Sequence, residues 1–121
     1  MEHNLKIIYD GAHCFGVKYK GKSIFEYGDI STCSFHATKI FHTVEGGCII
    51  CNDDELANRM RIIANHGQEK KYYHKVLGCN SRLDTIQAAI LNIKLKHLDS
   101  YSANRKIIAD KYDEAFINLK N

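Results

Sequence analysis

One stretch decides how the rest of this chain is interpreted: Ser34-Phe35-His36-Ala37-Thr38-Lys39-Ile40-Phe41-His42-Thr43-Val44-Glu45-Gly46-Gly47. It places Lys39 just past a short apolar strand, with the hydroxyl of Ser34 on that strand and a glycine pair beyond. A lysine amine in such a setting can hold a carbonyl compound as a Schiff base. Lysine is also common on solvated loops, so the stretch alone leaves Lys39 open between a catalytic role and a surface role.

Apolar runs on both sides of this stretch predict an α/β fold with strands at residues 5–9, 30–35 and 47–51. The third run is apolar along its length, as a strand covered on both faces would be. The first leads into Asp10-Gly11-Ala12-His13, so an acid stands at the carboxyl end of a strand, where ligands bind in open α/β sheets. The competing interpretation is that Asp10 caps the turn through Gly11.

Three helices follow from the spacing of apolar residues, at about 53–64, 83–98 and 100–119. We expect Asn52 to cap the first, with Glu55 closing a capping box, and Gly67 to end it in a left-handed conformation. Residues 68–75 are polar and predict the longest loop, whereas residues 19–22 predict a hairpin-like turn. The residues expected to face inward on the last two helices are Ile86, Ala89, Ile90, Ile93 and Leu98, then Ile107, Ile108, Tyr112, Ala115 and Phe116.

Length and composition limit the classes of protein. A chain of 121 residues with 45% hydrophobic and 26% charged residues can form one compact domain. Its net charge of +3 is mild and its basic residues are scattered, so we expect no nucleic-acid or membrane partner. No apolar run approaches the roughly 20 residues of a membrane span, and the N-terminus lacks a signal-peptide pattern, which predicts a cytoplasmic protein.

Cysteine usage argues against disulfides and metal. The chain has five cysteines, an odd number, mostly inside apolar segments, which predicts reduced and buried thiols. Cys48 and Cys51 have the spacing of a zinc knuckle, but residues three apart on a strand point to opposite faces and no second cysteine pair follows. We therefore expect no metal site.

The order of the short motifs resembles a known family. The motifs are Asp10-Gly11-Ala12-His13, Ser34-Phe35-His36-Ala37-Thr38-Lys39, Glu45-Gly46-Gly47, Asn52-Asp53, Asn65-His66-Gly67, Asn80-Ser81-Arg82-Leu83-Asp84 and Gln87-Ala88-Ala89. Together they resemble the DegT/DnrJ/EryC1/StrS family of nucleotide-sugar aminotransferases, which depend on pyridoxal 5'-phosphate. The resemblance covers nearly the whole chain. It implies part of the large domain of a fold-type I transferase, a three-layer α/β/α structure.

The resemblance also implies roles for five residues. Lys39 would bind pyridoxal phosphate covalently and carry the proton of the amino-group transfer, and Asp10 would keep the pyridine nitrogen protonated. His13 would lie against the face of the cofactor ring, and Ser34 would donate its hydroxyl to the cofactor phosphate. Asn80 would reach the phosphate of the neighbouring subunit, so the active form would be a homodimer. The presence of Lys39 argues against the dehydratase branch of the family, whose members replace this lysine.

The implied reaction moves an amino group, with glutamate as the donor, to a nucleotide-linked keto sugar. Relative to full members, residues 1–121 correspond to a single partial domain, truncated at both ends, that contains the lysine and two C-terminal helices. We therefore expect little turnover from the chain alone. The alternative is a truncated α/β module of the same lineage without catalysis, which acts, if at all, through protein–protein interaction.

Overall fold

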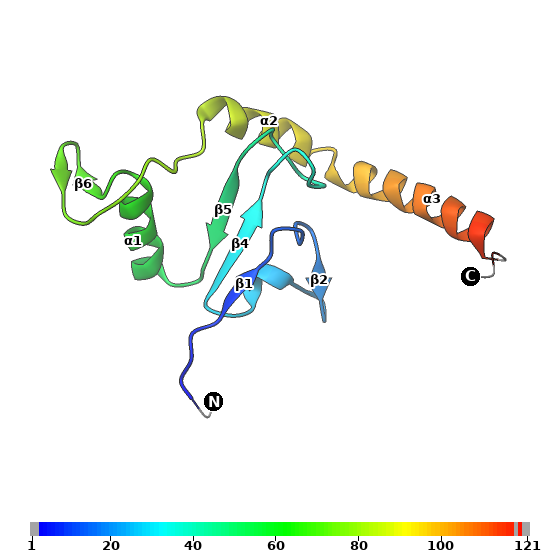
Figure 1. Ribbon diagram of the computed structural model, residues 1–121, viewed down its shortest axis with the longest axis horizontal. Coiled ribbons are helices and arrows are strands. Elements are labelled where there is room, and N and C mark those ends of the chain that lie inside the picture. The colour runs from blue at the N-terminus through cyan, green and yellow to red at the C-terminus, as the bar shows by residue number, and fades with distance from the viewer. Residues whose placement is uncertain (1–2, 118, 120–121) are drawn as a thin grey trace.

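A computed structural model describes residues 3–117 and 119 of the chain. Its centre is a three-stranded sheet in the order β1-β4-β5, formed by β1 (Ile8–Asp10), β4 (Ile30–Ser34) and β5 (Gly47–Ile50) (Figure 1). Strand β1 runs parallel to β4, whereas β4 and β5 are antiparallel and pair Ser34 with Gly47. The α/β class is confirmed. The connection from β4 to β5 carries Lys39 and begins at the edge where β1 ends.

The first strand starts later than the sequence predicts. Strand β1 pairs with β4 from Ile8, and the preceding residue, Ile7, bonds to Asp29 and to the first residue of β4. The Ile7 N–H donates to the carboxylate of Asp29 at 2.8 Å, and the Ile7 carbonyl accepts from the backbone N–H groups of Asp29 and Ile30. Asp29 also accepts from Lys6 and has a lowered pKa, mainly through its bond to Ile7 and then through Lys6. The Asp29 carboxylate thus fixes residues 6 and 7, which lead into β1.

The predicted turn near residue 20 is confirmed. Strands β2 (Lys18–Tyr19) and β3 (Lys22–Ser23) form a hairpin whose two turn residues both have positive φ. Positive φ at both central positions is typical of hairpin turns that match the twist of the strands. A short 3-10 helix, η1 (Ile24–Glu26), follows and is held by a capping box between Ser23 and Glu26.

Helix α1 (Asp54–Ala64) is capped by Asp53, so the prediction of Asn52 as the cap was wrong. The Asp53 carboxylate accepts from the Leu56 N–H at 2.9 Å, which places the cap one residue later. The glycine end of the helix is confirmed: Gly67 has a φ of 71° and donates to the carbonyl of Ile62.

Residues 68–75 were predicted as a loop, and this was wrong. They form the hairpin of β6 (Gln68–Lys70) and β7 (Tyr73–His74), which is irregular at one position. Backbone bonds hold it, among them the Lys75 N–H to the Gly67 carbonyl at 2.9 Å, together with polar side-chain contacts such as that of the His74 ring with the His66 carbonyl. Strand prediction from alternating hydrophobicity therefore has little to detect here.

The two C-terminal helices are α2 (Thr85–Leu95) and α3 (Leu98–Phe116). Helix α2 begins after Asp84, which forms a capping box with Gln87, and is shorter than predicted at both ends. Only part of the predicted inward surface is covered. Ile90 and Leu98 are half-buried, and Leu91, which was not predicted to face inward, is buried. Many of the residues predicted to face inward are exposed, among them Ile86, Ile93, Ile107, Ile108, Tyr112 and Phe116. Helix α3 projects away from the sheet, so within the described part of the chain its far half has no opposing layer (Figure 1).

The core lies where the lysine-bearing connection meets α2. Its buried members are Cys33, Phe35, Phe41 and Leu91, and the ring of Phe15 stacks on Phe41 with centroids 4.1 Å apart. Phe35 meets both rings edge to face. Because Phe35 and Phe41 flank Lys39 in sequence, their burial fixes both ends of the turn that carries the lysine.

The five cysteines are free thiols, but the expectation that they are buried holds only for Cys33. Cys33 and Cys48 are cross-strand neighbours on β4 and β5. Burial raises the pKa of the Cys33 thiol to about 11, with a smaller contribution from Cys48. Burial also raises the pKa of Cys48. In the described residues, no group of three or more metal-binding side chains comes together, and no helix has the length and apolar character of a membrane span.

Candidate functional site

Lys39 and His13 meet at the carboxyl edge of the sheet. The Lys39 amine lies 2.8 Å from Nε2 of His13, which belongs to the turn that follows β1. The backbone of Lys39 is held by a bond from its N–H to the carbonyl of His36 at 2.9 Å. Lys39 is half-buried and His13 is exposed, so the amine and the imidazole share one accessible position.

Asp10 and Ser34 end the two parallel strands at the same edge. Asp10 is the last residue of β1 and Ser34 the last of β4, and Asp10 is in register with Thr32. The Asp10 carboxylate accepts from the Ala12 N–H at 3.1 Å, as a turn cap would. Its exposure leaves the other oxygen accessible, so capping and ligand binding are compatible.

A close approach of the backbone explains the glycine that follows Asp10. A Cβ at Gly11 would lie 2.6 Å from a ring carbon of Phe25 and 2.8 Å from the carbonyl oxygen of Thr32. The turn therefore packs directly on β4. The turn that carries His13 thus starts in contact with the strand that leads to Lys39.

Asn80 lies apart from the other four candidate residues. It forms an isolated backbone bridge with Asn65, and its side-chain oxygen accepts from Arg82 at 3.4 Å. In the described part of the chain it has no hydrogen bond to Lys39, His13, Asp10 or Ser34. The structure thus brings four of the five predicted site residues to one edge and leaves Asn80 elsewhere on the surface.

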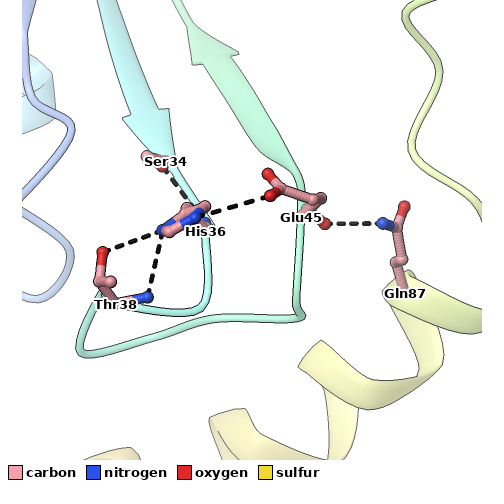
Figure 2. A network of polar contacts seen from close by, with 5 residues as sticks. All are labelled: Ser34, His36, Thr38, Glu45 and Gln87. Atoms are coloured by element: carbon pink, nitrogen blue, oxygen red, sulfur yellow. Dashed lines mark hydrogen bonds and ion pairs between the residues drawn. The ribbon is translucent and has the colours of Figure 1, made fainter.

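A polar network braces the turn that carries Lys39 (Figure 2). His36 is its centre: Nδ1 lies 2.9 Å from the Thr38 hydroxyl and accepts from the Thr38 N–H, while Nε2 lies 3.6 Å from the Glu45 carboxylate. The backbone carbonyl of Glu45 accepts from the Gln87 side chain at 2.7 Å. The Ser34 hydroxyl accepts from the His36 N–H. The network therefore links the end of β4, the lysine turn, the start of β5 and the first turn of α2.

Sequence reasoning gave no role to His36, Glu45 or Gln87, although each lies in one of the quoted motifs. The position of Glu45, nine residues after His36, allowed a contact across a hairpin connection, but Gln87 lies 42 residues beyond Glu45. Nothing in the spacing indicates that contact. It depends on where α2 packs.

Comparison with known proteins agrees with this architecture. The chain is 50% identical over 111 residues to a protein of Geobacillus stearothermophilus named pleiotropic regulatory protein, and the match covers 91% of this chain. It is 38% identical over 104 residues to the dTDP-4-amino-4,6-dideoxy-D-glucose transaminase of Shigella dysenteriae, with 86% of this chain covered. The crystal structure of S. venezuelae DesV superposes on 98% of this chain with a TM-score of 0.89 and 38% identity.

These matches cover only part of each relative. The chain spans 30% of the Geobacillus protein, 28% of the Shigella enzyme and 32% of the DesV chain. The profile of the DegT/DnrJ/EryC1/StrS aminotransferase family, in contrast, matches residues 1–121. The chain therefore belongs to the DegT/DnrJ/EryC1/StrS aminotransferase family.

Proposed function

We propose that this chain is the central part of the cofactor-binding large domain of an aminotransferase that uses pyridoxal 5'-phosphate. In this proposal residues 1–121 are a single partial domain, and the whole protein moves an amino group from glutamate to a nucleotide-linked keto sugar. Family membership and the name of the Shigella relative, a transaminase of a dTDP-linked amino sugar, support the type of reaction and substrate. We further propose a cytoplasmic homodimer.

The contact between Lys39 and His13 is the observation that carries the proposal. It joins a lysine amine to an imidazole at 2.8 Å, at the edge where Asp10 and Ser34 end their strands. An amine for a carbonyl, a carboxylate for a ring nitrogen, and a hydroxyl for a phosphate are the chemical groups that pyridoxal phosphate requires. The side chains of Lys39, Asp10 and Ser34 therefore fit the cofactor. When bound, the cofactor supplies an electron sink for the carbon that loses a proton.

Each side chain has a separate task in this proposal. Lys39 would hold the cofactor through Nζ and, when that amine is free, carry a proton on the same atom. Asp10 would accept a hydrogen bond from the ring nitrogen and keep its proton in place, because a carboxylate favours a neighbouring cation. His13 would lie against the ring, Ser34 would donate to the phosphate, and Asn80 would serve the site of the partner subunit.

The network around His36 supports this arrangement through the backbone. Its bonds to Thr38 and the bond between the Lys39 N–H and the His36 carbonyl set the direction from which the lysine leaves the turn. A precise approach is needed because a displacement of about 1 Å can cost two orders of magnitude in rate. We assign His36 a positioning role.

The first test is a visible absorption spectrum of the purified chain with added pyridoxal phosphate. We expect a band that is lost in Lys39→Ala and kept in Lys111→Ala, a matched change on exposed α3. Reduction with borohydride followed by mass mapping should place the adduct on Lys39. If no band appears, or if the adducts are spread over surface lysines, the chain does not build a cofactor site and the non-catalytic module is the better description.

The role of Asn80 has its own test. We expect the chain to sediment as a dimer, and we expect Asn80→Ala to weaken cofactor retention without loss of the dimer. Mixing Lys39→Ala with Asn80→Ala chains should restore binding in a fraction of the sites, because one site of each mixed dimer has both native residues. Restoration that fails although mixed dimers form would contradict a role across the subunit interface.

A further inference from the structure

A cavity outside the candidate site is lined by apolar and polar side chains from three elements, and each element contributes one basic side chain. Its volume is about 460 Å³, and it lies between the turn at residues 40–42, α2 and α3. His42 comes from the turn, Lys94 from α2 and Arg105 from α3, with Tyr101 and Asn104 of α3 beside them. A single water occupies about 30 Å³ of liquid, so the cavity has room for an ion with its hydration.

Two of the three basic groups are in contact. The Lys94 amine lies 2.9 Å from Nε2 and 3.1 Å from Nδ1 of His42, and the contact is partly buried. Burial lowers the pKa of His42, and the charges of Lys94 and Arg105 lower it further. Gathering like charges in a partly desolvated place is unfavourable unless an opposite charge joins them.

The described residues supply no such charge. No carboxylate lines the cavity, and neither Lys94 nor Arg105 takes part in an ion pair among these residues. At 3.6 residues per turn, the acids of α3 fall away from the face that carries Tyr101, Asn104 and Arg105. Those acids are Asp99, Asp110, Asp113 and Glu114. Arg105 is therefore not balanced by the acids of its own helix, and α2, which carries Lys94, has no acid between Thr85 and Leu95.

We propose that this cavity binds an oxyanion of the phosphate class. A tetrahedral anion with a charge near −2 can accept charge-assisted bonds from Lys94 and Arg105 at once, while Tyr101 and Asn104 offer neutral donors. With an anion bound, His42 gains an acceptor and can hold a proton. The inference does not depend on the proposed function, because it uses none of the residues assigned to the cofactor.

The test uses the chain without pyridoxal phosphate and inorganic phosphate as the probe. The ring signals of His42 are followed by NMR against pH, in phosphate and in sodium chloride of equal ionic strength, with His42→Gln providing the assignment. We expect phosphate to raise the pKa of His42 in a saturable manner. Because the readout is local to His42, phosphate held at Ser34 does not affect the interpretation.

Variants identify the binding groups. Lys94→Gln and Arg105→Gln should each weaken the phosphate effect about tenfold, the cost of a lost charge-assisted bond. Lys96→Gln, which removes an exposed charge just beyond α2, should not change it. An equal shift in sodium chloride would mean general screening and would overturn the proposal. An effect that depends on protein concentration rather than phosphate would assign the cations to carboxylates of a second copy, and would also overturn it.

Discussion

The buried thiol of Cys33 gives a prediction whose size follows from the structure. Cys33 is 5% exposed on the strand that leads to the lysine turn, and its pKa is raised from 9.0 to about 11, mainly by burial. The folded state therefore holds its proton more tightly than the unfolded state. Stability from this difference is complete below pH 9 and is lost as the pH rises toward 11. At 1.36 kcal/mol per pKa unit, the loss reaches about 2.7 kcal/mol, and about half of it is reached by pH 10.

Urea unfolding followed by far-UV circular dichroism, under reducing conditions, measures this loss. Between pH 8 and pH 10 the free energy of unfolding should fall by about 1.4 kcal/mol more in the native chain than in Cys33→Ala. Lysines and tyrosines titrate in both proteins, so their contribution cancels in the comparison. Both proteins carry Cys48→Ala, because the neighbouring Cys48 thiol also has a raised pKa and interacts with Cys33. Cys79→Ala, which removes an exposed thiol, should keep the native pH dependence. The reasoning fails if Cys33→Ala loses as much stability over this range as the native chain does.

Three further predictions concern the backbone, the core and the approach to β1. Gly67→Ala should unfold the region around α1, or cost at least about 2 kcal/mol, because the new Cβ would meet a carbonyl oxygen at 1.8 Å. Gly21→Ala, also at positive φ but in open space, should cost only about 1 kcal/mol, and equal costs in thermal melts would contradict this. Leu91→Ala should cost about 2–5 kcal/mol in urea unfolding, whereas Ile93→Ala, 63% exposed, should stay within about 0.5 kcal/mol. Asp29 has a lowered pKa, so the stability that its charged form provides is present above the ordinary pKa of 3.8. This stability is lost as the pH falls through the pKa of Asp29 in the folded chain, and NMR titration should find that pKa below 3.8.

The strands and the first helix could be predicted because their signals are local. Residues 47–50 are a short, largely apolar run and residues 30–34 a short run that contains Ile30, Thr32 and Cys33; both are bounded by turns. Helix α1 has acids at its start and Gly67 after its end. The hairpin at 68–74 could not, because its polar side chains show no alternation and backbone bonds define it. The cap of α1 was misplaced by one residue, since Asn52 and Asp53 are equally suitable by type and only the geometry chooses between them.

In the candidate site, too, only the contacts that follow from strand pairing could be predicted from the sequence. Asp10 and Ser34 could be placed together because each lies within one residue of the carboxyl end of a predicted strand, and parallel pairing brings those ends to one edge. The contact between His13 and Lys39, 26 residues apart, follows from the same pairing. His42 and Lys94 are 52 residues apart, and their contact depends on how α2 packs, which no periodicity in the sequence indicates.

The pairing of Ser34 with Gly47 also bears on whether the connection between β4 and β5 can gain residues during evolution. The lysine sits in a connection closed by strand pairing at both ends, and doubling the length of a flexible connection costs only about 0.6 kcal/mol in closure entropy. The entropy of closure therefore does not fix the length of this connection. Packing and geometry fix it, because one added residue would displace Phe41 from the core and move the Lys39 amine away from His13. Selection on this length would act on the core and on the site together.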